Sequence, residues 1–127
     1  MKTNWYENAI VYQIYPLSFM DSNNDGFGDI DGIISKLDYI KDLGVNAIWF
    51  SPLYKSPDYD YGYDISDYKA IDKKFGTMED FDRLLKECHS RDIKVIMDMA
   101  INHSSIEHEW FKKALESPDS KSCSFTI

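Results

Sequence analysis

Apolar residues of this chain fall into short continuous runs that alternate with stripes at helical spacing. Three β-prone runs, Ala9–Tyr15, Ala47–Ser51 and Lys94–Met99, predict strands, the first of them buried on both faces. Between these runs, apolar positions recur at helical spacing from Ile30 to Leu43 and from Phe81 to Cys88. Each stripe predicts a helix with one apolar face.

The predicted helices carry recognisable end signals. Asp29 and Asp31 are N-cap candidates for the first helix, and Gly44 suits the position just after its last turn. Thr77-Met78-Glu79-Asp80 resembles a capping box at the start of the second helix. A further short helix is predicted over His108–Leu115.

Two segments lack such periodicity. Residues 52–76 are dense in Tyr, Asp, Pro and Gly, and a loop of this length in a compact domain is usually functional. The tail from Ser117 to Ile127 is polar and is expected to be weakly structured.

The alternation of strands and helices predicts an α/β fold with a parallel sheet and right-handed crossovers. Two architectures fit: part of a doubly wound sheet, or the first three units of a (β/α)8 TIM barrel. Both bind ligands at the carboxyl ends of the strands. We therefore expect the chemistry in the segments after Tyr15, Phe50 and Met97.

Composition narrows the class of protein. The 127 residues suffice for one domain, and the net charge of −8 argues against a nucleic-acid partner. No apolar run is long enough to span a membrane, and residues 1–8 lack the apolar core of a signal peptide. Two cysteines, Cys88 and Cys123, make no disulfide framework, so a reduced, cytoplasmic location is expected.

Aromatic residues make up 15% of the chain. Amphipathic rings gathered in loops suit flat, hydroxylated ligands such as sugars. An aromatic-rich core explains the same number, and composition alone favours that simpler interpretation.

One loop has the donor spacing of a calcium site. Oxygen-bearing side chains occupy its first, third, fifth and ninth positions, with Gly26 at the sixth and the Phe27 carbonyl at the seventh. The bidentate glutamate of an EF-hand is missing, because Gly32 stands at the twelfth position. The alternative is a polar Asn/Asp/Gly loop without metal. The expected ligands are Asp21, Asn23, Asp25, Phe27 through its carbonyl, and Asp29.

Two further segments are candidates for ligand binding. Asp60–Tyr68 alternates carboxylates, which accept sugar hydroxyls, with aromatic rings, which cover the apolar face of a sugar; a solvated acidic loop is the alternative. Asp98 ends the third strand, and His103 follows as a candidate donor, although a lone histidine is more often structural. His89 and His108 show no partner pattern and are expected at the surface.

Several short segments follow one another along the chain in a distinctive order. They are Tyr12-Gln-Ile-Tyr-Pro16, the Asp21–Asp29 loop, Gly44-Val-Asn-Ala-Ile-Trp49, Ser51-Pro52, Tyr63-Asp64-Ile65, Phe75-Gly76-Thr77 and Asp98-x-x-x-Asn102-His103. Taken together and in this order, they closely resemble the N-terminal part of α-amylase family glycoside hydrolases, in the oligo-1,6-glucosidase and α-glucosidase subgroup. The resemblance covers roughly residues 4 to 117.

This resemblance implies a (β/α)8 barrel that hydrolyses short α-linked glucosides with retention. It implies that Asp60 and His103 bond the hydroxyls of the non-reducing glucose, that Tyr63 stacks under its ring, and that Asp98 supports the catalytic centre. It also implies that the Asp21–Asp29 loop holds Ca²⁺, with Mg²⁺ as the alternative. Residues 1–103 would be the barrel part and 104–127 the start of an insertion.

The chain departs from the family pattern in ways that limit what it can do. Leu17 stands where the family usually has Arg, and Asp92 where it usually has Gly. The pattern ends after Ser117, which suggests a truncated tail. A barrel needs about 250 residues and eight units. The nucleophile and the acid/base follow later strands in the family, so no catalytic residue of that pair is expected here.

The main interpretation is therefore the N-terminal fragment of an α-glucosidase-type hydrolase, inactive alone. The alternative is a non-catalytic metal- or carbohydrate-binding module that works as an oligomer. Three strands cannot close a barrel, so open edges are expected to promote self-association. The side chains expected to lose their partners across the barrel axis are Tyr12, Ile14, Ile48, Phe50, Val95 and Met97.

Overall fold

The structure is a computed structural model that describes residues 4–116. It divides into two compact units. The first unit contains the described residues up to Ser51 together with Lys74–Asp98. The second contains Pro52–Lys73 and the described residues from Met99 onward. The predictions about the tail after Ser117 lie outside the described residues, and the division at residue 103 stays a prediction.

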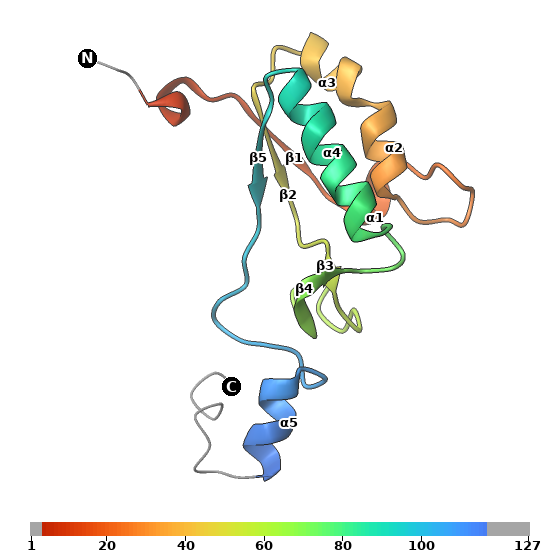
Figure 1. The fold of residues 1–127 in the computed structure, drawn as a ribbon, viewed down its shortest axis with the longest axis vertical. Coiled ribbons are helices and arrows are strands. Elements are labelled where there is room, and N and C mark those ends of the chain that lie inside the picture. Colours follow the sequence, from red (N-terminus) through yellow and green to blue (C-terminus); the bar gives the residue numbers. More distant parts are fainter. Residues whose placement is uncertain (1–3, 117–127) are drawn as a thin grey trace. The chain divides into compact units, whose positions relative to one another are not determined.

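The first unit is built on a three-stranded parallel sheet. Its strands are β1 (Val11–Ile14), β2 (Ala47–Phe50) and β5 (Lys94–Met97), in the order β1-β2-β5 (Figure 1). The strands pair in register, with Ile14 opposite Phe50 and Phe50 opposite Met97. The predicted parallel α/β arrangement is confirmed, although each strand is shorter than its apolar run.

Helices connect these strands. They are the short α1 (Pro16–Phe19), α2 (Ile30–Ser35), α3 (Leu37–Asp42) and α4 (Met78–Ser90), preceded by a 3-10 turn over Trp5–Asn8. The helix predicted from Ile30 to Leu43 is interrupted at Lys36, whose φ of −107° and ψ of 0° leave the helical region. Leu43, expected in its apolar stripe, is 50% exposed.

The predicted helix ends are confirmed. The Asp29 side chain accepts a hydrogen bond from the Gly32 N–H and caps α2. Thr77 and Asp80 form a reciprocal capping box at the start of α4. Gly44 takes a φ of +82° after α3, a conformation that glycine adopts without steric cost.

One face of the sheet is covered by α2, α3 and α4, and this corrects two predictions (Figure 1). Ile14, Ile48 and Phe50 are fully buried, so their face of the sheet is the one against the helices. The expectation that they would lose partners across a barrel axis is therefore wrong. The face carrying Val11, which is 47% exposed, is the open one, and β1 is not buried on both faces.

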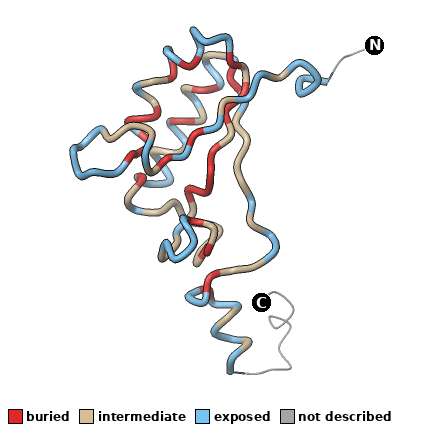
Figure 2. The backbone as a smooth tube through the Cα atoms, turned by 180° about the vertical axis from the view of Figure 1, so that it is seen from behind, coloured by how far each residue is buried: buried red, intermediate tan, exposed pale blue. Residues whose placement is uncertain are grey.

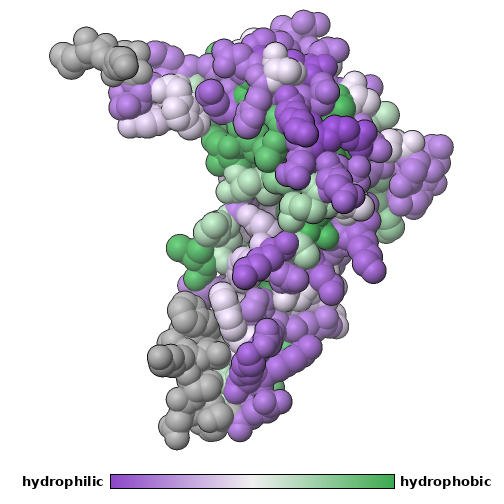
Figure 3. All heavy atoms as spheres, in the orientation of Figure 1, coloured by the Kyte–Doolittle hydropathy of each residue, from purple (hydrophilic) through white to green (hydrophobic). Residues whose placement is uncertain are grey.

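The distribution of apolar atoms agrees with this assignment. Buried stretches run through β2 and along one side of the helices (Figure 2). Apolar side chains gather over the strands, whereas the helices beside them are mostly polar on the outside (Figure 3). Two arginines tie those outer surfaces together: Arg83 of α4 pairs with Asp31 of α2, and Arg91 pairs with Asp38 of α3 at 2.7 Å.

The second unit contains an antiparallel pair that the aperiodic sequence did not predict. It consists of β3 (Tyr54–Lys55) and β4 (Asp67–Ile71), with an irregular register between them. The short helix α5 (Glu109–Glu116) confirms the predicted one, shifted by one residue at each end. No helix in the described part of the chain is long and apolar enough to cross a membrane.

Asp92 stands at the turn between α4 and β5 with a φ of +53°. This is the left-handed conformation that the usual glycine would adopt there, and aspartate is among the side chains that tolerate it. The structure thus places Asp92 in the left-handed region, which aspartate adopts at a greater steric cost than glycine.

Candidate active-site loops

The loop that carries the predicted metal ligands is closed at its base by α1. The Gly28 N–H donates to the Leu17 carbonyl at 2.7 Å, and the Asp29 N–H donates to the Met20 carbonyl at 3.0 Å. A Cβ added to Gly28 would lie 2.0 Å from the Pro16 carbonyl oxygen, so only glycine fits. The backbones therefore approach too closely for any side chain at this point.

The same crowding explains why the loop lacks the glutamate of an EF-hand. A Cβ at Gly32 would lie 2.0 Å from the Met20 carbonyl oxygen. The twelfth position of the loop thus faces backbone instead of the loop interior, and no ligand can come from it.

Inside the loop, side-chain oxygens accept backbone N–H groups. Asp21 accepts from Asn23, Asn24 and Gly26 at 2.7–3.0 Å. These bonds, led by the one from Gly26, lower the pKa of the Asp21 carboxyl. The Asn23 side chain accepts from Asp25, and the Asp25 side chain accepts from Phe27, each at 2.9 Å.

This hydrogen bonding suits a hard cation. Each carboxylate or amide oxygen that accepts one N–H keeps a further lone pair, and oxygen is the donor that Ca²⁺ prefers. Asp29 differs from the other predicted ligands: it is buried, and its two oxygens accept from Gly32 on one side and Ser22 on the other. Among the described residues, no three His, Cys, Asp or Glu side chains gather into a metal-binding group. A cation here would thus depend on Asn23 and on the Phe27 carbonyl as well.

In the second unit, a buried carboxylate organises the loop that contains Asp60 and Tyr63. Asp64 is 8% exposed and accepts hydrogen bonds from the Ser56 hydroxyl at 2.8 Å and from the Tyr59 and Asp60 N–H groups at 3.0 Å. Burial opposes ionisation, but the bonds from Ser56, Asp60 and Tyr59 outweigh it and lower the pKa of Asp64. Asp64 therefore remains a carboxylate that fixes the loop.

The two predicted sugar-binding residues of this loop lie on its outer part. Asp60 is exposed, and its carbonyl accepts the Tyr63 N–H at 2.9 Å in a tight turn. Gly62, at the centre of that turn, is buried with a φ of +92°. Tyr63 is half-buried. The turn thus holds both residues on one short segment of fixed backbone.

The third candidate segment follows β5. The Asp98 N–H donates to the Phe50 carbonyl at 3.1 Å, which extends the pairing of β5 with β2 beyond the strand. Asp98 consequently stands at the carboxyl end of the sheet, as predicted, and it belongs to the first unit. His103 belongs to the second unit and is half-buried, and its Nδ1 lies 3.2 Å from the Asn102 amide nitrogen.

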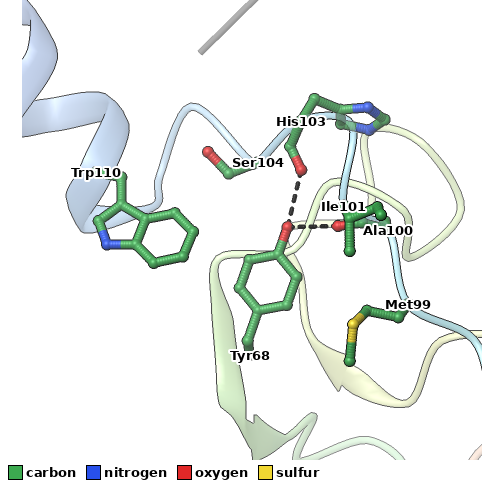
Figure 4. Close-up of a pocket in the computed structure, with 7 residues that line it drawn as sticks. All are labelled: Tyr68, Met99, Ala100, Ile101, His103, Ser104 and Trp110. Carbon is green, nitrogen blue, oxygen red and sulfur yellow. Dashed lines mark hydrogen bonds between the residues drawn. The ribbon is translucent and has the colours of Figure 1, made fainter. Parts of the chain in front are cut away.

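Two anchors hold the segment around His103. The Tyr68 hydroxyl lies 2.8 Å from the carbonyl oxygens of both Ala100 and His103 (Figure 4). The Ser105 N–H donates to the Ile65 carbonyl at 2.9 Å, next to Asp64. Asp60, Tyr63 and His103 thus belong to one hydrogen-bonded unit, whereas Asp98 and the metal loop belong to the other.

An aromatic cluster underlies this segment. Tyr68 stacks with Trp110 at 5.9 Å between ring centroids, and His108 packs edge-on to Tyr68 at 5.5 Å. A cavity of about 310 Å³ lies beside it. Its lining residues are Tyr68, Met99, Ala100, Ile101, His103, Ser104 and Trp110 (Figure 4).

Sequence patterns missed three residues of these loops. Asp64 and Tyr68 lie within the recognised Asp60–Tyr68 segment, but nothing marked them as the anchors. His108 was expected at the surface, and this is wrong: it is 8% exposed, and its Nδ1 accepts the Trp110 N–H at the start of α5. Its position at the start of the predicted helix was the available signal, because a residue at a helix start can cap the helix.

The parallel strands, the crossover helices and the candidate loops after β2 and β5 define an incomplete (β/α)8 barrel. Residues 13–127 match the family described as "Alpha amylase, catalytic domain", and the chain belongs to that family. The resemblance found from the sequence motifs is thus confirmed.

The similar curated proteins include an "Alpha-glucosidase" of Schizosaccharomyces pombe and an "Oligo-1,6-glucosidase" of Bacillus cereus, each 58% identical. The matches cover 92% and 95% of this chain but only 20% and 22% of the relatives. The chain therefore spans about a fifth of the length of these relatives.

Solved structures agree with this result. A mutant of the trehalose-6-phosphate hydrolase of Bacillus licheniformis superposes with a TM-score of 0.92 at 54% identity, over 95% of this chain and 22% of that one. A trehalulose synthase mutant solved in complex with sucrose superposes with a TM-score of 0.91 at 51% identity, also over 95% of this chain and 22% of that one. The fold of this chain is that of the matched part of these enzymes.

Proposed function

We propose that this chain supplies the first part of a retaining α-glucosidase that acts on short α-linked glucosides. The observation that carries the proposal is the Asp64-centred loop, which fixes its backbone with a buried carboxylate and leaves the Asp60 side chain exposed. In a chain of the α-amylase family, such a loop suits the recognition of a sugar.

Each proposed role follows from the chemistry of the side chain. The Asp60 carboxylate accepts hydrogen bonds from two sugar hydroxyls, and the His103 imidazole donates one. The Tyr63 ring covers the apolar face of the glucose. Asp98, at the end of β5, supports the catalytic centre without attacking.

Retaining hydrolysis needs two carboxyl groups that flank the scissile bond, and none of the described residues is assigned to that pair. We therefore expect no turnover of an aryl α-glucoside by this chain alone. Turnover that disappears in Asp98→Asn or Asp60→Asn would contradict the assigned roles.

A chimera tests the sugar-binding roles directly. Residues 4–116 would replace the matched segment of the Bacillus cereus oligo-1,6-glucosidase, and kcat/KM for an aryl α-glucoside would be measured. Asp60→Asn should lower it roughly 10- to 100-fold, since a hydrogen bond to a charged group contributes about 1.5–3 kcal/mol. Asp42→Asn, on the exposed end of α3, is the matched control. An Asp60→Asn chimera as active as this control refutes the assignment.

We also propose that the Asp21–Asp29 loop binds Ca²⁺, with Mg²⁺ as the alternative. The proposal is supported by the side-chain oxygens of Asp21, Asn23 and Asp25, which stand at alternate positions and accept N–H groups of the turned backbone. Calorimetry on the chain after treatment with a chelator should show heat with Ca²⁺ at millimolar concentration or below. Asp21→Asn should weaken binding, whereas Asp42→Asn should not. No heat with either cation at millimolar concentration refutes the site.

The open edge of the sheet supports a further proposal, self-association. In the described residues, no strand pairs with the outer edge of β1, and Ile10 and Val11 are 58% and 47% exposed. An unpaired edge is a template for pairing with another copy. Light scattering at micromolar concentration should show a dimer or a larger species, and Val11→Lys should reduce it. A monodisperse monomer refutes the proposal and the alternative of an oligomeric module.

The proposed location is the cytoplasm. Cys88 is a free, fully buried thiol, and burial raises its pKa to about 11. A cysteine that is free and not part of a disulfide accords with a reducing compartment. Fractionation of the source cells tests this proposal.

A further inference from the structure

Tyr68 occupies an unusual position in the second unit. Its side chain reaches from β4 to the segment after β5, and its hydroxyl lies 2.8 Å from the carbonyl oxygens of Ala100 and of His103. Tyrosine has a single O–H, so one proton is shared between two acceptors that are three residues apart. The hydroxyl thereby closes the backbone between them into a loop.

The ring of Tyr68 is fixed by its neighbours. Trp110 stacks on it at 5.9 Å, His108 packs edge-on at 5.5 Å, and Tyr54 lies tilted at 6.2 Å. Burial, followed by repulsion from the Tyr54 phenol once that group is ionised, raises the pKa of the Tyr68 phenol. The hydroxyl therefore keeps its proton at neutral pH and remains a donor.

The direction of the His103 side chain follows from this arrangement. The His103 carbonyl points at the Tyr68 hydroxyl, while its imidazole points away from Tyr68 (Figure 4). Because the carbonyl carbon and Cβ are bonded to the same Cα, fixing the carbonyl restricts the direction in which the His103 side chain leaves the backbone. Within residues 4–116, the Tyr68 hydroxyl is the hydrogen-bond donor to the His103 carbonyl.

We propose that Tyr68 is a positioning residue, whose hydroxyl fixes the backbone from Ala100 to His103 and thereby aims the His103 imidazole. The consequence for sugar binding rests on the proposed function, in which His103 bonds a glucose hydroxyl. The positioning itself does not depend on that function.

The test is nuclear magnetic resonance on the whole chain and its Tyr68→Phe variant, which keeps the ring and removes only the hydroxyl. We expect the imidazole carbon and proton signals of His103 to shift, while those of the exposed His89 stay in place. We also expect the Ser105 amide, which donates to Ile65, to exchange with solvent roughly three- to tenfold faster. Tyr39→Phe, which removes an exposed hydroxyl from α3, is the matched control.

Unchanged His103 signals and unchanged Ser105 exchange in Tyr68→Phe would overturn the proposal. If the variant fails to fold, the unmodified chain still decides. The Tyr68 hydroxyl proton should then exchange slowly enough to be observed, and exchange as fast as that of the exposed Tyr59 would overturn the proposal.

Titration with glucose separates this proposal from the proposed function. Sugar that moves the His103 signals in the unmodified chain but less in Tyr68→Phe supports both. Sugar that leaves the His103 signals unmoved in the unmodified chain refutes the role of His103, whereas the variant's effect on the signals without sugar still decides the role of Tyr68.

Discussion

Replacing Gly32 by alanine should destabilise the chain, although alanine is the better helix former. Gly32 lies inside α2 with helical backbone, where the exchange would normally stabilise by about 1 kcal/mol. Here the new Cβ would lie 2.0 Å from the Met20 carbonyl oxygen and 2.8 Å from its carbonyl carbon. Both are backbone atoms, so α1 and α2 must move apart.

The magnitude follows from what that movement disrupts. Overpacking costs about 1–3 kcal/mol. The bonds from Asp29 to Met20 and from Gly28 to Leu17 would lengthen, and each contributes roughly 1 kcal/mol. After the gain in helix propensity is subtracted, the free energy of unfolding should fall by roughly 2–4 kcal/mol.

Urea unfolding, followed by tryptophan fluorescence and circular dichroism, measures the change. Gly44→Ala is the matched control, because an added Cβ there meets nothing within 4 Å and only the φ of +82° causes strain. That strain should cost about 1–2 kcal/mol. If Gly32→Ala is as stable as the original chain, or loses no more than Gly44→Ala, the account of the crowded loop base is wrong.

Three further predictions concern the helix ends. Asp92→Gly should stabilise by roughly 0.5–1 kcal/mol, because it removes left-handed strain at φ +53°, and thermal unfolding measures this. Burial lowers the pKa of His108 in the folded chain, although the charges of Asp67 and Glu109 oppose this shift. The neutral imidazole therefore contributes fully to the free energy of unfolding above the pKa of the unfolded chain, and this contribution is lost as pH falls below about 6.5. Urea unfolding at pH 7 and pH 5 should show the loss, and the difference between the two pH values should be smaller in His108→Asn. Arg91→Lys should lower the free energy of unfolding by about 0.5 kcal/mol, because one ammonium nitrogen replaces the two guanidinium nitrogens that bond Asp38 and Glu87. The cost should be smaller in high salt, and a cost that does not change with salt would contradict this.

The regular part of the fold follows from local signals in the sequence. Apolar runs of strand length gave β1, β2 and β5, and the capping residues Asp29 and Thr77 marked where helices begin. These signals suffice because every unit of such a sheet repeats the same order, a strand followed by a helix, with the strands parallel. The face of each strand could not be assigned in the same way, since a strand that is apolar on both sides shows no alternation.

The strands β3 and β4 of the second unit and the anchors of its loops were not predicted, for a different reason. β3 has only two residues and pairs with β4 through an irregular register, so no period of alternation can develop. The anchors Asp64 and Tyr68 act through backbone partners, Tyr59, Asp60 and two carbonyls, that any residue type provides. A pattern of side-chain types cannot reveal bonds of that kind.

In the Asp64-centred loop, the residue that fixes the backbone is not the residue proposed to bind the ligand. Asp60 contributes its backbone N–H and carbonyl to the loop, while its side chain contributes no bond to the Asp64 carboxylate. A protein engineer could therefore exchange the side chain at position 60 for others and alter which ligands are recognised, while the loop keeps its conformation. The same freedom is absent at position 64, where a neutral side chain would weaken the bonds to Ser56, Tyr59 and Asp60 at once.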